Sequence, residues 1–286
     1  MEKPGFPTPC KHRFPQLHIH GQLYTVPQRL LLLKGENTNM RFMIKYGKES
    51  HLQQIIDGKI RFSPSQTYIK IEETQHNKGQ GDLLEGKMKL RIERARIHDP
   101  DTDKLIGILP PCTMLFSIQD VNNMPVFCLS QYNDDDITSY IDERNFSIAL
   151  ANEKTECIKT DFPDATHALI ILEPDKFVND ILHIQQHCIF SDKIKYYEYD
   201  INPLQMYMYL ATGQTELQKN TPLSMTYENR YRHLLCKDMS FSKQQEYRFI
   251  VLDELITEAS FYTFSFTSKY LLVPIEELSS LLDICL

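Results

Sequence analysis

The most apolar residues of this chain come in short runs of four or five, separated by stretches long enough to hold helices. Three such runs are Val126–Ser130, Ala168–Leu172 and Phe249–Leu252. Runs of this length, rich in aromatic and branched residues, are typical of buried strands. They are far shorter than the roughly 20 residues of a membrane-spanning helix. Because the spacing between them is irregular, the sequence predicts an α+β fold with a mixed or antiparallel sheet and flanking helices.

The charge and the cysteines narrow the class of protein further. The 286 residues carry a formal net charge of −7, which argues against a general nucleic-acid coat protein but allows a local basic strip. The seven cysteines include no Cys-x-x-Cys pair, which favours reduced thiols and argues against disulfides or a structural metal. The N-terminus lacks the basic-then-apolar order of a signal peptide. We therefore expect a cytoplasmic protein with no membrane partner.

The domain organisation follows from the prolines. Five of them fall in residues 1–35, namely Pro4, Pro7, Pro9, Pro15 and Pro27. Proline cannot donate a backbone hydrogen bond, so this spacing prevents a regular helix and favours an extended arm. We expect residues 1–35 to form a proline-rich N-terminal arm and residues 36–286 to form a single folded domain.

The folded domain is predicted to begin with a strand, a helix and a second strand. The first strand covers Met40–Gly47 and the second covers Ile60–Ser63. The helix between them runs from Ser50 to Asp57, and Ser50 with Gln53 has the spacing of a capping box. A polar stretch follows the second strand.

Two features follow this polar stretch. The segment Gly79–Gly86 holds three glycines, which predicts either a mobile loop that can approach a ligand closely or a plain surface turn. Polar and apolar residues then alternate in a strand that places Lys87, Lys89 and Arg91 on one face. These three side chains are candidates for holding phosphates of a substrate, and a solvated strand face is the alternative.

The most informative motif lies late in the chain, where Gln244 and Glu246 precede the apolar run Phe249–Leu252. Residues two apart on a strand point the same way, so Gln244, Glu246 and Arg248 are expected on one face and Tyr247 on the other. A fixed carboxylate stabilises positive charge on a ribosyl group as nicotinamide leaves NAD, and a nearby amide can orient the incoming nucleophile. The alternative for Glu246 is a salt bridge to Arg248.

The Gln244-x-Glu246 motif resembles the Gln/Glu-x-Glu motif of the ADP-ribosyltransferase superfamily, which also lies late in the chain. The resemblance implies a split sheet with a cleft for NAD, which is the substrate of a glycosyltransferase reaction. Glu246 would be the catalytic carboxylate and Gln244 its positioning neighbour. The early segments Tyr46-Gly47-Lys48 and Ser63-Pro64-Ser65 are similar in order to the strands that bind NAD. The resemblance implies cofactor contacts from these residues and from Tyr68: Tyr46, Gly47, Lys48, Ser63 and Tyr68.

More specifically, Gly81-Asp82-x-x-Glu85-Gly86 and Phe241-Ser242-x-Gln244-x-Glu246-Tyr247-Arg248-Phe249 resemble motifs of a poorly characterised bacterial family, over about residues 40 to 255. Its members often occur near toxin or phage-defence genes. This resemblance implies a toxin or anti-phage effector that modifies a nucleic acid or a protein, with an antitoxin or chaperone as a further partner. The Ser-Thr-Ser triplet and the first Arg or His of the superfamily are absent.

Two other functions remain open on the sequence. Asp82, Glu85 and Lys87 have an acidic-x-Lys arrangement that is similar to that of magnesium-dependent nucleases. A non-enzymatic binding module could dock a partner through the arm and the basic strip. Transfer of ADP-ribose and simple hydrolysis of NAD are not distinguished by the motif.

Overall fold

The computed structural model describes residues 16–19, 22–25, 40–133, 136, 139–140, 145–148, 152–184, 187–214, 226–279 and 282–285. The chain divides into two compact units, Met1–Asn37 and Thr38–Leu286. In the first unit, β1 (Gln16–Ile19) and β2 (Gln22–Thr25) pair antiparallel. The rest of the expected proline-rich arm lies outside the described residues.

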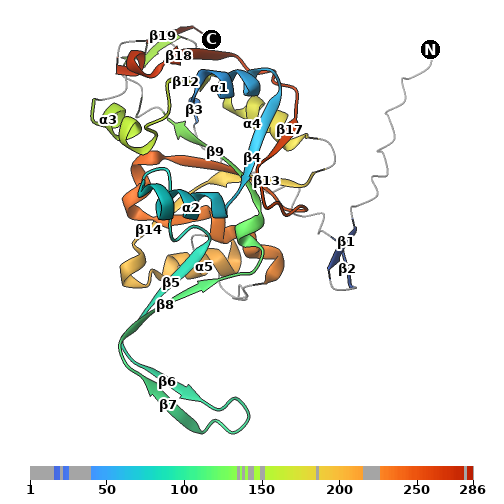
Figure 1. The fold of residues 1–286 in the computed structure, drawn as a ribbon, viewed down its shortest axis with the longest axis vertical. Coiled ribbons are helices and arrows are strands. Elements are labelled where there is room, and N and C mark those ends of the chain that lie inside the picture. Colours follow the sequence, from blue (N-terminus) through green and yellow to red (C-terminus); the bar gives the residue numbers. More distant parts are fainter. Residues whose placement is uncertain are drawn as a thin grey trace, which may run out of the picture. The chain divides into compact units, whose positions relative to one another are not determined.

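An eight-stranded sheet forms the centre of the second unit (Figure 1). Six strands follow the order β13, β16, β9, β3, β12 and β18, with β4 and β17 attached beside this path. Its strands are β3 Phe42–Gly47, β4 Lys59–Pro64, β9 Pro125–Tyr132, β12 His167–Ile171, β13 Ile189–Lys193, β16 Glu246–Val251, β17 Ser260–Thr263 and β18 Tyr270–Pro274. The pairings described in this sheet are antiparallel, and the expected α+β class is confirmed.

Strands β3 and β4 pair with the same edge of β9, each at a different end of that edge. β3 pairs with residues 130–132 of β9, whereas β4 pairs with residues 125–126. β16 occupies the other edge over residues 126–130. Residues 127–129 therefore have no strand partner on the shared edge within the described part of the chain. The ammonium of Lys45 donates to the carbonyl oxygen of Cys128 at 2.5 Å in this gap.

Helices cover both faces of the sheet, as expected for strands that are apolar on both sides. Leu52 and Ile55 of α1 share a core with Phe177 of α4, and Ile158 of α3 packs with Ile170 on the opposite face. The helices are α1 Glu49–Ile56, α2 Gln66–Gln75, α3 Asn152–Asp161, α4 Pro174–Leu182 and α5 Leu204–Thr212. None of the helices in the described ranges is long and apolar enough to cross a membrane.

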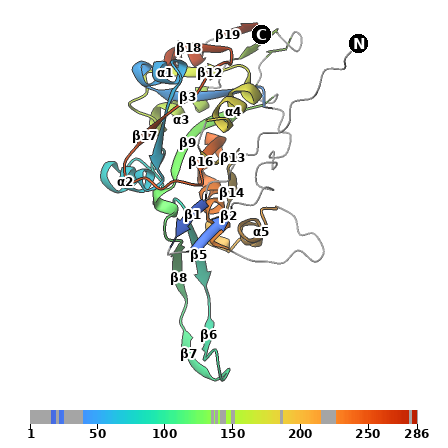
Figure 2. The same ribbon diagram turned by 90° about the vertical axis from the view of Figure 1, so that its right-hand side faces the viewer.

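Smaller sheets and 3-10 turns complete the second unit. A two-stranded ribbon projects from the body in both views (Figure 2) and consists of β5 Lys87–Ile92 with β8 Cys112–Ser117 and β6 Ala95–His98 with β7 Leu105–Leu109. The remaining strands are β10 Ser139–Tyr140, β11 Asn145–Ile148, β14 Lys195–Tyr197, β15 Cys236–Asp238 and β19 Leu282–Cys285. The 3-10 turns are η2 Val121–Asn123, η4 Tyr199–Ile201, η5 Tyr227–Leu235, η6 Met239–Gln244 and η7 Ile275–Ser279.

Three local expectations are corrected. The helix expected from Ser50 begins at Glu49 with Lys48 as its N-cap, and no side chain caps it, so the capping box with Gln53 is wrong. The polar stretch around Tyr68 is helix α2, whose single buried apolar residue gives little periodicity. The sequence also predicts helical character over Met225–Cys236, and the structure has the 3-10 turn η5 there.

Gly58 ends α1 with a left-handed backbone, and its replacement by alanine is expected to destabilise the fold by about 1–3 kcal/mol. Its φ is +78°, and an added Cβ would lie 2.4 Å from the backbone oxygen of Phe264. Urea titration of the variant checks this. Gly107→Ala is the control, because no described atom lies within 4 Å of its Cβ position. Equal losses in the two variants would contradict the explanation.

Candidate functional site

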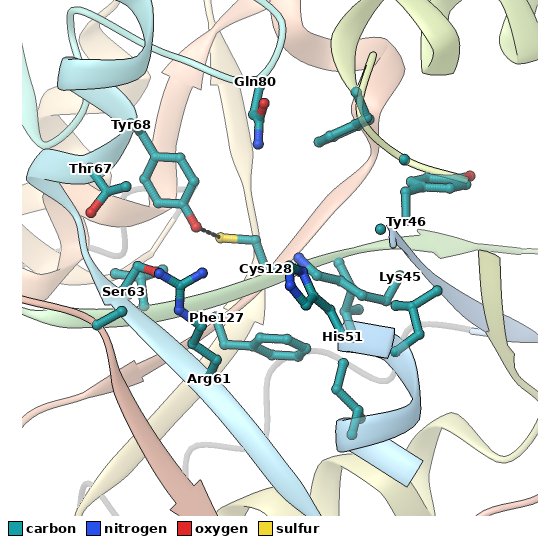
Figure 3. Close-up of a pocket in the computed structure, with 18 of the residues that line it drawn as sticks. Lys45, Tyr46, His51, Arg61, Ser63, Thr67, Tyr68, Gln80, Phe127 and Cys128 are labelled. Carbon is teal, nitrogen blue, oxygen red and sulfur yellow. Dashed lines mark hydrogen bonds between the residues drawn. The ribbon is translucent and has the colours of Figure 1, made fainter. Parts of the chain in front are cut away.

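A cavity of about 820 Å³ lies between β3 and β4, beside the gap in the β9 edge (Figure 3). Its volume is within the range of small-molecule sites, roughly 300–1,000 Å³. Every residue expected to act in catalysis or to bind NAD lines it: Tyr46, Gly47, Lys48, Ser63, Tyr68, Gln244 and Glu246. The fold thus brings two early strands, helix α2 and the start of β16 to one place.

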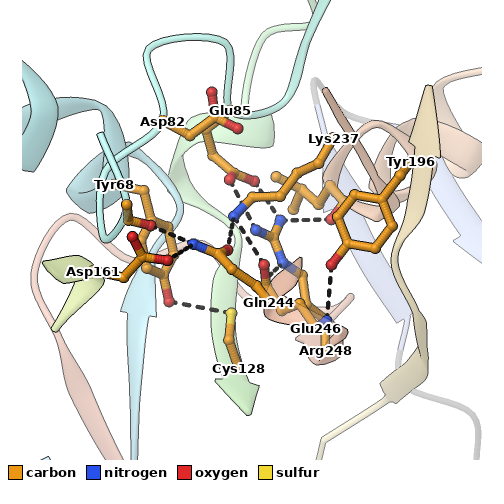
Figure 4. A network of polar contacts seen from close by, with 12 residues as sticks. Tyr68, Asp82, Glu85, Cys128, Asp161, Tyr196, Lys237, Gln244, Glu246 and Arg248 are labelled. Carbon is orange, nitrogen blue, oxygen red and sulfur yellow. Dashed lines mark hydrogen bonds and ion pairs between the residues drawn. The ribbon is translucent and has the colours of Figure 1, made fainter. Parts of the chain in front are cut away.

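Glu246 opens β16 and lies among positively charged groups (Figure 4). The Nε of Arg248 donates to its Oε1 at 2.6 Å, and the Nζ of Lys237 lies 2.8 Å from its Oε2. Burial would raise the pKa of Glu246, but the charges of Arg248 and Lys237 outweigh burial and hold it well below its usual range. Oε2 is buried and has the ammonium of Lys237 as its partner. The expected salt bridge to Arg248 therefore exists, and it lies at the cavity.

Arg248 is completely buried and ties this carboxylate to the glycine-rich segment. Its two terminal nitrogens donate to the carboxylate oxygens of Glu85 at 2.5 and 2.9 Å, and one also donates to the carbonyl oxygen of Leu234. The pair Glu246 and Arg248 faces away from Tyr247, which packs in the core. The expected division of β16 into a polar face and an apolar face is therefore confirmed.

Gln244 lies outside β16, because it ends the turn η6 and Gln245 after it has a left-handed backbone. Its amide nitrogen donates to the oxygen of Gly79 at 2.6 Å and to Asp161 at 3.0 Å. Its amide oxygen accepts from the ammonium of Lys237 at 3.3 Å. The expectation that Gln244 shares a strand face with Glu246 is wrong, but Lys237 joins the two side chains.

Two tyrosines form walls of the cavity. The hydroxyl of Tyr68 and the thiol of Cys128 share a hydrogen bond at 3.3 Å. Tyr46 stacks on Phe162 with ring centroids 5.7 Å apart, and its hydroxyl bonds that of Tyr132 at 2.6 Å. Burial raises the pKa of Tyr68 well above its usual value. Burial is also the largest of the causes that raise the pKa of Cys128 to about 12. Both groups therefore stay protonated at neutral pH, and the ring of Tyr46 is largely covered.

The cavity is more positive than the chain as a whole. Five lysine and arginine side chains line it against three carboxylates. The basic residues are Lys45, Lys48, Lys59, Arg61 and Lys237, and the acidic residues are Asp164, Glu246 and Glu258. Figure 3 shows Arg61 of β4 and His51 of α1 pointing into the space between their elements. This balance favours an anionic ligand.

The basic strip of β5 lies on the ribbon, outside the cavity lining. Lys87 donates to the carbonyl oxygen of Leu83, Lys89 pairs with Asp200, and Arg91 pairs with Glu93. These three side chains thus have partners within the protein.

The segment Gly79–Gly86 is anchored to the body by its acidic residues. Glu85 is 1% exposed, and both of its carboxylate oxygens accept hydrogen bonds from Arg248. Asp82 is also buried and accepts from the backbone amide of Leu84 at 2.8 Å. This geometry gives the nuclease hypothesis no support. The described residues hold no cluster of three or more His, Cys, Asp or Glu arranged for a metal ion.

Asp82→Asn is expected to be more stable than the wild type at pH 7 and equally stable at pH 4. Burial, followed by the charge of Glu85, raises the pKa of Asp82 from 3.8 to about 6. The wild type therefore loses stability as the pH rises through this interval, because the unfolded carboxyl ionises first. Urea titrations should give a difference that grows to roughly 1–3 kcal/mol by pH 7. A difference independent of pH would contradict the assignment.

Sequence reasoning missed Lys237, Lys45 and Cys128. Lys237 lies in the three-residue strand β15, next to a cysteine, with no motif around it. Lys45 and Cys128 belong to strands that were expected, and their positions on the cavity side become evident only from the gap between β3 and β4.

Comparison with known proteins gives no relative for this chain. No protein-family model, curated protein or solved structure matches it.

Proposed function

We propose that this protein is an NAD-dependent ADP-ribosyltransferase whose catalytic carboxylate is Glu246. One observation carries the proposal: the late motif and the early motif, far apart in sequence, line the same cavity. The resemblance to the superfamily requires this meeting, and a chance Gln-x-Glu triplet has no reason to produce it.

The sheet supports the proposal at the level of the fold. In ADP-ribosyltransferases, as the resemblance implies, NAD lies in the cleft of a split sheet. Here β3 and β4 pair with different ends of the same edge of β9, and residues 127–129 between them have no strand partner in the described part of the chain. We therefore propose that the sheet is of the ADP-ribosyltransferase type and that NAD enters this opening.

The charge at Glu246 fits cleavage of the bond between nicotinamide and ribose. The electron pair of that bond leaves with neutral nicotinamide, and the ribosyl group carries positive charge until a nucleophile adds to its C1′ and releases a proton. Arg248 and Lys237 keep Glu246 ionised, so a fixed negative charge faces the ribosyl group.

The other cavity residues suit the rest of NAD. Lys48, at the start of α1, supplies positive charge for the diphosphate. Tyr68 is the better candidate for contact with the nicotinamide ring, because Tyr46 is already stacked on Phe162. Gln244, whose amide is taken up by three partners, serves to hold Lys237 and the glycine-rich segment and does not contact the nucleophile.

The biological setting is part of the proposal and comes from the resemblance alone. The acceptor is a nucleic acid or a protein, and the enzyme acts as a toxin or anti-phage effector. An antitoxin or chaperone partner would restrain it in the producing cell.

The test is incubation of the purified protein with NAD labelled in the adenylate phosphate, with and without cell extract. Nicotinamide release measured by chromatography reports cleavage, and label in macromolecules reports transfer. Free labelled ADP-ribose alone would indicate hydrolysis. If the folded protein neither binds NAD nor releases nicotinamide, the proposal is wrong, and magnesium-dependent cutting of nucleic acid without NAD would favour the nuclease.

A further inference from the structure

One face of β4 leads from the protein surface into the cavity. Lys59, Arg61 and Ser63 alternate along this strand, and all three line the cavity. Residues two apart on a strand point the same way, so the three side chains form one row about 13 Å long. Lys59 and Arg61 are exposed, whereas Ser63 is half-buried. The row therefore runs from the mouth inward.

An exposed aromatic ring lies beside this row. Phe261 of β17 is directly opposite Arg61 in the antiparallel pairing of β17 and β4, and it also lines the cavity. It is 56% exposed, which is a high value for a large aromatic side chain. Core packing does not account for a ring with this exposure. Because residues directly opposite each other on paired strands have adjacent side chains, the ring of Phe261 lies next to Arg61.

The basic groups of the row are available to a ligand. Neither Lys59 nor Arg61 forms an ion pair within the described part of the chain, in contrast to Lys89 and Arg91 on the ribbon. Glu258 also lines the cavity near this end of β17 and opposes part of their charge. Two cations and a free aromatic face remain together at the mouth.

We propose that this mouth binds a single-stranded nucleic acid, with one base stacked on Phe261 and the backbone phosphates on Lys59 and Arg61. Aromatic side chains beside basic groups are the recurring means of holding single strands, because every base has a flat face and every linkage a negative charge. A peptide has neither feature at regular spacing. The row would then direct the neighbouring nucleotide toward Ser63 and Tyr68.

That the bound nucleic acid is the acceptor of ADP-ribose rests on the proposed function, but the binding of the nucleic acid at this mouth does not. Binding is measured by fluorescence anisotropy with a labelled single-stranded DNA or RNA dodecamer and no NAD. We expect saturable binding that weakens as salt rises. Phe261→Ala should weaken it by about 5-fold or more, and Phe261→Trp should retain it.

Charge reversal provides the matched control. The double variant Lys59→Glu with Arg61→Glu should lose binding, whereas Arg94→Glu with Arg96→Glu, which makes the same charge change on the ribbon, should keep it. Circular dichroism checks the fold of each protein. The proposal is overturned if the wild type does not bind either oligonucleotide at low salt, if Phe261→Ala binds as well as the wild type, or if the ribbon variant loses binding equally.

Calorimetry with NAD alone separates the two proposals. Oligonucleotide binding without NAD binding would refute the proposed function and leave the docking site standing. NAD cleavage with label entering only protein would refute nucleic acid as the acceptor.

Discussion

Glu246→Gln is expected to lower the rate of nicotinamide release from NAD by roughly 10²- to 10³-fold, while the protein still folds. The substitution keeps the shape of the side chain and an acceptor for Arg248, but it removes the negative charge that would face the ribosyl group. Binding of NAD, measured by calorimetry, should change much less than turnover, because the charge matters most when the carbon–nitrogen bond is breaking.

Glu85→Gln is the matched control for this prediction. Glu85 pairs with the same arginine and is also buried, but it does not line the cavity. Both variants should lose stability through Arg248, and only Glu246→Gln should lose turnover per folded molecule. Equal losses of turnover would mean that the network, and not the carboxylate at the cavity, is what the reaction requires.

Arg248→Met is expected to lower the free energy of unfolding by about 3–5 kcal/mol. Methionine fills much of the space of the arginine stem, but it leaves Glu85 and Glu246 buried without their shared counter-charge. Burial lowers the pKa of the arginine, yet the two carboxylates outweigh burial and raise it well above its usual range, so the wild-type side chain is charged at all working pH values.

Urea titration at several pH values measures this loss. The stranded carboxylates should take up protons more readily, so Arg248→Met should regain stability relative to the wild type as the pH falls from about 7 to about 5. Adding Glu85→Gln to Arg248→Met removes one stranded charge and should restore part of the stability at pH 7. A loss below about 1 kcal/mol would show that water reaches these groups and that the network contributes little.

Much of the sheet could be predicted from the sequence because its strands are short, apolar and bounded by polar residues. Val126–Ser130, Ala168–Leu172 and the run after Arg248 lie within or overlap central strands. That these strands are buried on both faces can be predicted from their local sequence alone, because each run is apolar at successive positions. Strand β13 was missed, since Ile189–Lys193 mixes polar and apolar residues without a clear alternation.

The site was less accessible to prediction, because long-range pairing determines it. The division of β16 into a polar and an apolar face follows from strand geometry, and this part was derived correctly. The partner of Arg248 could not be derived, since Glu85 lies 163 residues earlier in the chain. The helix around Tyr68 has a single buried residue, Ile69, so its sequence carries only a weak amphipathic signal.

The position of β16 in the sheet has a consequence for synthesis on the ribosome. This strand lies between β13 and β9, yet it is made from Glu246–Val251, which follow five of the other seven strands of the sheet in the chain. A nascent chain that has not yet emerged beyond these residues cannot join β13 to the rest of the sheet, and it also lacks the carboxylate of Glu246 at the cavity. A product truncated before Glu246 would therefore lack both this connection within the sheet and the proposed catalytic group.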